Sequence, residues 1–558
     1  MKFAGAFLLA LAAAGPAAAS DRSPIQYVLS VTSDRTLSLE IRLRGDADGE
    51  TRIDLPDRWA GSENLWRALS GFSAAGGTVT GEGAVRTVRH RPRARLVLRY
   101  AVRSADPGTE ASDKARPVVG TDGFFFHGEG VFATPAGREQ APVRFRWGSV
   151  PPGWTAASDL DHLAARSGSL SDISESVGLG GRDLTVATRT VGGAPLRVAV
   201  RGKWDFAPAD LAALVAKIMA AEHAYWSDRP EPFFVAMAPI PDSSGRISST
   251  GTGRGDGFSI LSTGGFDLGQ ATRLLGHEYM HHWIADRLGG LPAEQPGREF
   301  WFSEGFTDHL TAAALLRSGL WSLADYFADK NRVLLRYAAS PARSASGSEI
   351  AERFWKDEHF EQISYDRGHL LALAVEARIR SESAGRLTLG DVLRAQLKAA
   401  ATGGLTGAAL FPKVLAQTAS VDMGEEIRRL AVDGEPFLLP PDAFGPCARI
   451  AVERRKAFTR GFDSDATVAA GMTLRGVDPE GPAHAAGLRD GMRLIRRERG
   501  IIGDSAQEIA YRVVDASGER VIAYLPQAKA EFDVQQAVPT IAGEGAETAC
   551  RRLLGGGE

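Results

Sequence analysis

The chain has 558 residues, which is too long for one ordinary hydrophobic core and predicts roughly two to four domains. Hydrophobic residues make up 44% and charged residues 24%, the balance of a soluble globular protein and not of a disordered or membrane protein. The formal net charge of -3 gives no basic surplus for nucleic acid, and no acidic tract forms a solvating tail.

The N-terminus has the pattern of a secretory signal peptide. Lys2 precedes an apolar run over residues 3–14, and Gly15-Pro16 is followed by three alanines that end at Ala19. The run is too short to cross a bilayer as a helix of the mature protein. We expect residues 1–19 to be removed and the mature protein to be periplasmic or secreted, with no membrane span. The alternative is an uncleaved N-terminal anchor.

Residues 20–203 have the pattern of an all-β domain. Apolar residues recur at every second position, for example at Leu37, Leu39, Ile41 and Leu43 and at Leu196, Val198 and Val200. This alternation is typical of half-buried strands, and Gly- and Asp-rich turns separate the runs.

The remaining chain divides at two places. Near residue 208 the spacing of the apolar residues changes from that of strands to that of helices, and near residue 440 several prolines mark a linker. Residues 204–440 contain a helix over 209–226, a short strand with a returning partner, and then mainly helical patterns. Residues 447–530 return to short strands, with a hairpin expected around Ala516-Ser517-Gly518. Residues 531–558 are rich in Gly, Ala and Glu and are expected to form a loosely ordered tail.

The two cysteines, Cys447 and Cys550, both lie near the C-terminal end. In an oxidising compartment such a pair is more often bridged than free. We therefore expect a disulfide between them, closing a loop of about 100 residues.

The motif H-E-x-x-H occurs once, from His277 to His281, within a helical pattern that begins after Asp267 and stops at Leu288-Gly289-Gly290. Residues i and i+4 share a helix face, so the two imidazoles can bind one metal ion. Glu278 points beside the metal, where it can remove a proton from a bound water.

A second helical segment, which starts at Phe300, supplies the third ligand. A catalytic zinc takes three protein ligands and keeps a fourth position open, and Glu304 offers the missing carboxylate. Asp308 lies one turn later on the same face, where it can accept the second ring N–H of a ligating histidine. The sequence therefore predicts one Zn²⁺ per chain; two imidazoles and a carboxylate favour zinc over cobalt or manganese.

These motifs resemble those of the gluzincin metallopeptidases. His277 to Trp283 and Trp301 to Asp308 are most similar to the glycyl aminopeptidase family (peptidase family M61). The resemblance implies a β N-terminal domain, a thermolysin-like helical domain and a C-terminal PDZ domain. It also implies that Tyr365, in the segment Tyr365-Asp366-Arg367-Gly368 just before a helical run over residues 369–379, donates its O–H to the tetrahedral intermediate. Residues 481–491 are similar to the G-P-A-x-x-A-G-L-x-x-G segment of bacterial PDZ domains.

One departure concerns recognition of the substrate amine. Related aminopeptidases usually carry a Gly-x-x-Glu segment before the zinc helix, whereas the matching stretch here starts at Gly253 and has no Glu. Asp256 is a candidate substitute for that carboxylate, and the alternative for Asp256 is a turn residue.

The function predicted from the sequence is that of an exported zinc metallopeptidase. By resemblance it is an aminopeptidase for small N-terminal residues, in which Glu278 activates a zinc-bound water. Two alternatives stay open: a zinc endopeptidase, and a catalytically inert protein that binds peptide C-termini through its PDZ-like domain. The expected partners are peptide or protein substrates and not nucleic acid.

Overall fold

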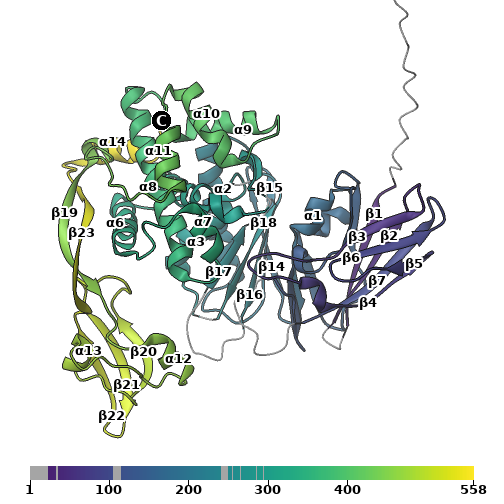
Figure 1. Cartoon of the computed structure of the whole chain (residues 1–558), viewed down its shortest axis with the longest axis horizontal. Coiled ribbons are helices and arrows are strands. Elements are labelled where there is room, and N and C mark those ends of the chain that lie inside the picture. The colour runs from purple at the N-terminus through teal and green to yellow at the C-terminus, as the bar shows by residue number, and fades with distance from the viewer. Residues whose placement is uncertain are drawn as a thin grey trace, which may run out of the picture.

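The computed structural model has three parts, which follow one another along the chain (Figure 1). It describes residues 23–32, 36–104, 115–240, 249–253, 256–263, 265–284, 286–292 and 294–557. The signal peptide predicted at residues 1–19 lies outside the described residues. No helix within the described ranges has both the length and the apolar character needed to cross a membrane.

The N-terminal part consists of three sheets with strand orders β11-β1-β2-β7-β4, β10-β3-β6-β5 and β12-β13-β9-β8. The apolar positions that alternate in the sequence, such as Leu37, Leu39 and Ile41 on β2, are buried in a shared core. The β-rich N-terminal part expected from the sequence is therefore confirmed. Its elements are β1 (Ile25–Thr32), β2 (Thr36–Arg44), β3 (Glu50–Asp54), β4 (Leu69–Ala75), β5 (Gly77–Thr80), β6 (Val85–His90), β7 (Arg95–Arg103), β8 (Val118–Val119), β9 (Gly123–His127), β10 (Thr134–Pro135), β11 (Val143–Trp147), β12 (Thr155–Ser158), α1 (Leu170–Ser174) and β13 (Val177–Gly181).

The central part is built on a five-stranded sheet of order β14-β15-β16-β18-β17. Three strands, β15, β16 and β18, are parallel, and the edge strands β14 and β17 are antiparallel to their neighbours. The strands are β14 (Thr185–Val191), β15 (Ala194–Val200), β16 (Phe233–Pro239), β17 (Ser249–Gly253) and β18 (Gly257–Ser262).

This sheet moves the boundary between the first two parts. The alternating pattern predicts an N-terminal domain that ends at residue 203, but β14 and β15 pair into the central sheet, so the division lies between β13 and β14. Period-two alternation identifies a strand but carries no information about which sheet the strand joins, and this explains the difference.

Helices cover one face of the central sheet, and the third sheet of the N-terminal part packs against its other face (Figure 1). The helix expected over 209–226 is present as α2. The helices of this part are α2 (Pro208–Trp226), α3 (Leu268–Met280), α4 (Phe300–Ser303), α5 (Gly305–Ser318), α6 (Leu323–Ala339), α7 (Gly347–Arg353), α8 (Glu358–Glu382), α9 (Leu389–Ala400), α10 (Gly407–Ala419) and α11 (Gly424–Ile427).

Two helix boundaries differ from those expected. The helix that begins after Asp267 ends at Met280, not at Leu288, and a turn follows before a short 3₁₀ segment. Tyr365, expected just before a helical run, lies inside the 25-residue helix α8. In both cases tertiary packing decides the end of the helix and local pattern does not.

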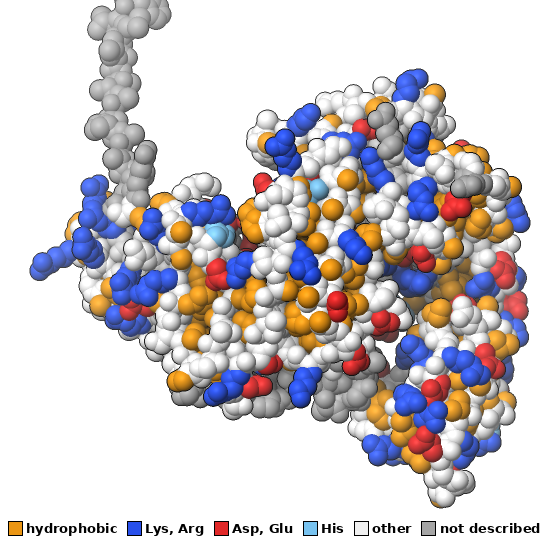
Figure 2. All heavy atoms as spheres, turned by 180° about the vertical axis from the view of Figure 1, so that it is seen from behind, with side chains coloured by type: hydrophobic (Ala, Val, Ile, Leu, Met, Phe, Trp, Pro, Cys, Tyr) orange, Lys and Arg blue, Asp and Glu red, His pale blue; other side chains and the backbone are white. Residues whose placement is uncertain are grey.

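The C-terminal part hangs from a long two-stranded ribbon, β19 (Ala448–Phe458) and β23 (Gln527–Pro539), which connects it to the central part (Figure 1). It also contains a three-stranded sheet and two short helices. The hairpin expected around residues 516–518 is present, with Asp515 opposite Gly518. These elements are α12 (Ser464–Ala469), α13 (Pro482–Ala485), β20 (Arg493–Arg499), β21 (Ile509–Asp515) and β22 (Gly518–Tyr524). Figure 2 shows acidic and basic side chains interspersed over this part, in keeping with the small net charge.

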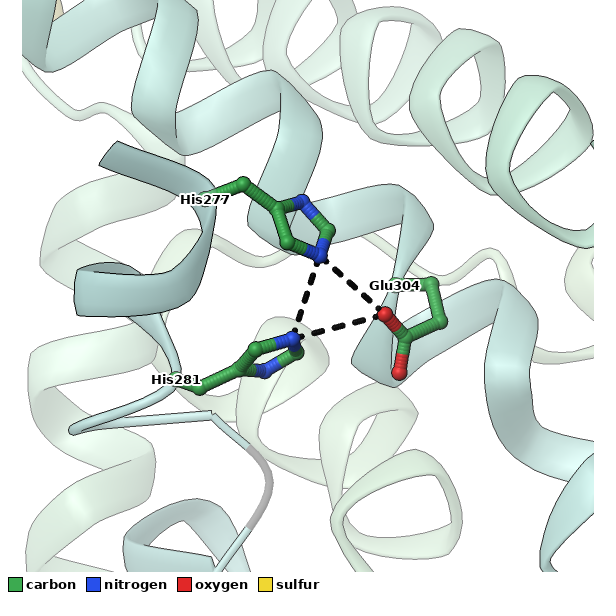
Figure 3. Close-up of side chains that lie close together, drawn as sticks. All are labelled: His277, His281 and Glu304. Atoms are coloured by element: carbon green, nitrogen blue, oxygen red, sulfur yellow. Dashed lines mark hydrogen bonds and ion pairs between the residues drawn. The ribbon is translucent and has the colours of Figure 1, made fainter. Parts of the chain in front are cut away.

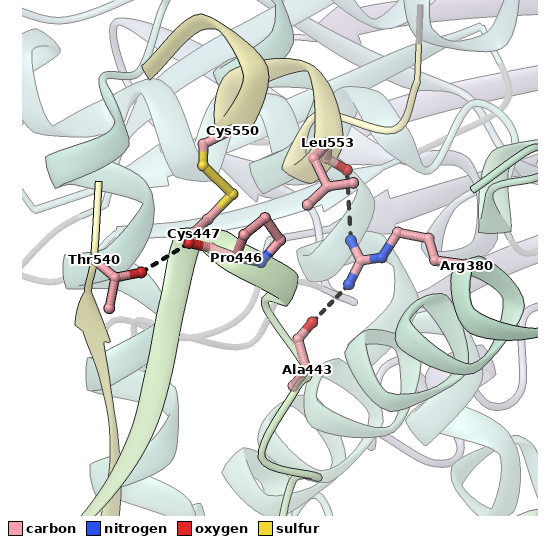
Figure 4. The surroundings of a disulfide bond; sticks show 7 residues. All are labelled: Arg380, Ala443, Pro446, Cys447, Thr540, Cys550 and Leu553. Atoms are coloured by element: carbon pink, nitrogen blue, oxygen red, sulfur yellow. Dashed lines mark hydrogen bonds between the residues drawn. A yellow bond between two sulfur atoms is a disulfide. The ribbon is translucent and has the colours of Figure 1, made fainter. Parts of the chain in front are cut away.

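The expectation of a loosely ordered tail over 531–558 is wrong. Residues up to Pro539 continue β23, and α14 (Glu544–Leu554) packs back against α5. Cys447 and Cys550 form a disulfide with their Cα atoms 5.5 Å apart (Figure 4). Beside it, Arg380 donates hydrogen bonds to the carbonyls of Ala443 and Leu553. The disulfide expected from the two cysteines is therefore present, and it fixes the tail to the central part.

Candidate metal centre

Two histidines one helical turn apart form the first half of the site (Figure 3). His277 lies in the last turn of α3, and His281 is the residue that ends this helix. Their rings are perpendicular, and the two Nε2 atoms are 3.1 Å apart. The i, i+4 spacing thus brings both imidazole nitrogens to one point, as expected from the motif.

Glu304 completes a group of three possible ligands. Its Oε2 lies 3.3 Å from His277 Nε2 and 3.4 Å from His281 Nε2 (Figure 3). Two ligand atoms that share one tetrahedral zinc at about 2.0–2.1 Å are separated by roughly 3.3 Å. Among the described residues, this is the group of His, Cys, Asp and Glu side chains whose ligand atoms could hold a metal ion. The residues therefore fit zinc.

An interruption between two helices sets the position of Glu304. It is the residue between α4 and α5, and close packing on α8 fixes both helices. A Cβ at Gly305 would lie 2.3 Å from Gly368 Cα, and a Cβ at Gly368 would lie 1.8 Å from the carbonyl oxygen of Trp301. Only glycine permits such a close approach of two helices, and this approach also brings Tyr365 of α8 to the site.

The outer nitrogens of both histidines are occupied. His277 Nδ1 is 2.8 Å from Asp308 Oδ1, and His281 Nδ1 is 2.9 Å from the carbonyl oxygen of Ile284. Each contact fixes the ring so that Nε2 faces the common point. The position predicted for Asp308, one turn after Glu304, brings its carboxylate to His277.

The site strongly favours positive charge. Burial opposes protonation of His277, but hydrogen bonds to Asp308 and Glu304 outweigh burial and raise its pKa to about 10. Burial also opposes protonation of His281, and the charge of Glu304 raises its pKa nonetheless. Conversely, the two histidines hold the pKa of Glu304 well below its usual value despite burial. The negative potential that binds these protons is equally suited to a divalent cation.

Glu278 and Tyr365 border the ligand group. The side chain of Glu278 is buried and lies against Gly251 of the edge strand β17. The ring of Tyr365 is 5.7 Å, centroid to centroid, from that of His277. Burial, followed by the charge of Glu304, raises the pKa of Tyr365 well above its usual value, so the phenol keeps its proton at neutral pH.

Asp256 lies apart from the ligand group, in a small polar pocket. The pocket lies where residues of the N-terminal part meet the central sheet, and it is lined by Asp159, Leu160, His162, Asp172, Glu175 and Asp256. Burial and then the charge of Asp172 raise the pKa of Asp256. Its assignment as an amine anchor stays a prediction.

One contact near the site was not predicted from the sequence. Arg273, four residues before His277 on α3, donates a hydrogen bond from Nη2 to Asp308 Oδ2 at 2.6 Å. Burial raises the pKa of Asp308, but the charge of Arg273 and then the hydrogen bond to His277 more than reverse this, so the carboxylate stays ionised. The i−4 spacing from His277 was the available signal, since it puts Arg273 on the face that carries the ligands.

Comparison with known proteins agrees with this geometry. Residues 270–362 match the M61 glycyl aminopeptidase family, and this segment contains all three ligands and Asp308. No curated protein matches the chain in sequence.

Solved structures show the same fold at low sequence identity. An aminopeptidase N family protein from Idiomarina loihiensis superposes with a TM-score of 0.68 at 15% identity, covering 94% of this chain and 99% of that one. An M1 zinc metallopeptidase from Deinococcus radiodurans gives 0.51 at 16% identity, covering 75% and 96%. The resemblance to the glycyl aminopeptidase family and the identification as a zinc-dependent metallopeptidase are therefore confirmed.

Proposed function

We propose that the protein is an exported aminopeptidase that removes small N-terminal residues from peptides. The observation that carries the proposal is the convergence of His277, His281 and Glu304, with Glu278 and Tyr365 beside them. The family match supports the choice of an aminopeptidase. A mutant of the Deinococcus radiodurans metallopeptidase has been crystallised with a Tyr-Ser-Ala substrate, which supports short peptides as the substrate class; the preference for small N-terminal residues rests on the family match alone.

In this mechanism each residue of the site has a defined role. His277, His281 and Glu304 would hold the zinc ion, which when bound would supply a Lewis acid for the peptide carbonyl and lower the pKa of a water molecule. Glu278 accepts the proton of the attacking water and passes it to the departing amine. Tyr365, whose raised pKa keeps its O–H intact, donates a hydrogen bond to the developing oxyanion.

Export is supported by two features. The N-terminal pattern is that of a signal peptide, and the Cys447–Cys550 disulfide suits an oxidising compartment outside the cytoplasm. The proposal therefore places the protein in the periplasm or outside the cell. A fusion of residues 1–25 to a reporter that is active only after export tests this part.

The C-terminal part is proposed to be PDZ-like and to bind peptide C-termini. The glycines of the PDZ-type segment support this, because Gly487 and Gly491 take positive φ values of 108° and 85°, which turns of that kind require. Titration of the full chain with peptides that end in a free carboxylate or in an amide tests the assignment.

One observation favours an endopeptidase as the second candidate. The stretch from Gly253 to Phe258 contains no Glu, and Asp256 lies in a pocket of its own. A panel of peptides with free and acetylated N-termini separates the two activities. Hydrolysis of the free peptides alone supports the aminopeptidase, and equal turnover of the acetylated peptides replaces it with the endopeptidase.

Glu278→Gln tests the chemistry itself. This variant should keep one zinc per chain and lose turnover, because the amide cannot accept the proton. Glu352→Gln, at an exposed position on α7, is the matched control and should keep full activity. Turnover that survives Glu278→Gln would refute the proposed role of Glu278.

A further inference from the structure

Behind the proposed metal centre, a chain of charged side chains runs across three helices, with its two carboxylates buried and its arginine partly exposed. His277 and Arg273 belong to α3, Asp308 to α5 and Asp329 to α6. Asp308 uses one oxygen for His277 and the other for Arg273, at 2.8 and 2.6 Å. Arg273 in turn donates from Nε to Asp329 Oδ1 at 2.9 Å. The histidine is thus connected to a third helix that carries no ligand.

The geometry explains why arginine suits this position. A guanidinium presents its donors in a fixed planar fork, so contacts at Nε and Nη2 fix its orientation relative to both carboxylates. The side chains of Asp308 and Asp329 are 2% and 3% exposed, so water does not compete for their oxygens. A carboxylate held by His277 alone would be free to rotate about that contact, whereas the second contact removes this freedom.

The third helix is itself held in place. α6 begins with a capping box at Ser322, in which Ser322 and Asp325 bond each other's backbone N–H groups. On its outer side, Asn331 exchanges two hydrogen bonds with the backbone of Ala537 in β23, at 3.0 and 2.8 Å. Asp329 therefore reaches Arg273 from a rigid support.

We propose that Arg273 and Asp329 are positioning residues that hold the Asp308 carboxylate against His277 and thereby set the affinity of the site for zinc. The inference rests on the proposed zinc site and adds to it two residues outside the ligand set. Neither residue is a ligand: their effect on the metal passes through Asp308. Loss of an outer partner of a ligating histidine typically weakens metal binding by about 10- to 100-fold.

The alternative is that Arg273, Asp308 and Asp329 only hold α3, α5 and α6 together and thus have a purely structural role. A purely structural role contributes to the stability of the fold but not to the orientation of His277. The two roles therefore differ in one measurable quantity, the dissociation constant for zinc of the folded protein. Thermal unfolding alone would not separate them.

The test is competition for Zn²⁺ between a chromogenic chelator and the full chain, with the fold checked by circular dichroism. Arg273→Gln should weaken zinc binding about tenfold or more. Arg273→Lys, which keeps the charge but contacts only one carboxylate, should fall between Arg273→Gln and the unmodified protein. Asp329→Asn should shift the affinity in the same direction and provides a second variant if Arg273→Gln does not fold.

Arg332→Gln is the matched control. Arg332 lies on α6, as Asp329 does. Its side chain is 48% exposed and pairs only weakly with Asp329, at 3.9 Å. This variant should bind zinc as the unmodified protein does. If the Arg273→Gln and Asp329→Asn variants fold and bind zinc with unchanged affinity, the proposal is overturned and only the structural role of these residues remains.

The outcome is independent of the proposed function. If the unmodified protein hydrolyses peptides while both variants bind zinc normally, the positioning role fails and the aminopeptidase stands. If both variants lose zinc affinity while no peptide is hydrolysed by the unmodified protein, the positioning role stands and the aminopeptidase fails.

Discussion

A methyl group at Gly251 tests whether the position of Glu278 is essential. Gly251 is buried on the edge strand β17, and a Cβ there would lie 2.0 Å from Oε1, 2.2 Å from Cδ and 2.4 Å from Cγ of Glu278. The φ angle of Gly251 is not positive, so alanine can adopt the same backbone without strain. The substitution Gly251→Ala therefore acts on the Glu278 carboxylate and not on the strand.

The size of the effect follows from these distances. To reach an ordinary contact of 3.4 Å, Oε1 must retreat by about 1.4 Å. The side chain can do so by leaving its preferred rotamer, at about 0.5–1.5 kcal/mol. The loss of backbone freedom in the unfolded chain offsets about 0.4–1 kcal/mol of this. Stability should therefore change by less than about 1 kcal/mol, whereas a misplacement of about 1 Å can lower the rate 100-fold.

The assay is steady-state hydrolysis of a free N-terminal peptide, together with zinc analysis and urea unfolding. Gly251→Ala should lose kcat by about 100-fold, keep one zinc per chain and unfold at nearly the same urea concentration. Gly545→Ala on α14, where a Cβ meets nothing within 4 Å, is the control and should keep full activity. A kcat within threefold of the unmodified protein, at equal zinc content, would refute the reasoning that Glu278 must occupy its present position.

Two further predictions concern stability. The double variant Cys447→Ala, Cys550→Ala should lose roughly 4–5 kcal/mol in the free energy of unfolding, because the disulfide closes a loop of 103 residues. Urea unfolding of the variant and of the unmodified protein, the latter with and without reductant, measures this loss. An equal unfolding midpoint for the variant and the oxidised unmodified protein would contradict the prediction. Lys330 is fully buried beside His369 Nε2, and burial lowers its pKa from 10.5 to about 8. The unfolded chain therefore binds more protons between pH 8 and pH 10.5, so stability should rise with pH through this window. Lys330→Met should remove that rise, worth up to roughly 3 kcal/mol, and a rise unchanged in the variant would exclude Lys330 as its source.

The ligand group could be predicted from sequence because its spacings are local. His277 and His281 are four residues apart, and so are Glu304 and Asp308, so helical geometry alone puts each pair on one face. The one long-range step, that the two helices meet, followed from the need of a catalytic zinc for a third ligand. The alternating strands of the N-terminal part are local in the same sense.

The features that escaped prediction depend on contacts between distant residues. Arg273 and Asp329 are 56 positions apart in the sequence. The paired strands β15 and β16 are separated in the sequence by the whole of helix α2. The disulfide to Cys447 was predicted, but the packing of α14 against α5 was not, because the Gly- and Ala-rich composition of the tail does not show it. Gly251 gave no signal because its role is to lack a side chain beside Glu278.

Two of the three proposed ligands lie where regular helix geometry stops. His281 ends α3, and Glu304 separates α4 from α5, so neither ligand is fixed by a continuous helix on both sides. At such breaks the surrounding packing must supply the rigidity that a helix interior would give. The glycine contacts between α5 and α8 do so for Glu304, and the carbonyl of Ile284 does so for His281. His277, inside α3, has its ring held by Asp308, and Arg273 in turn holds the second oxygen of that carboxylate, so the support of this ligand extends beyond its own helix.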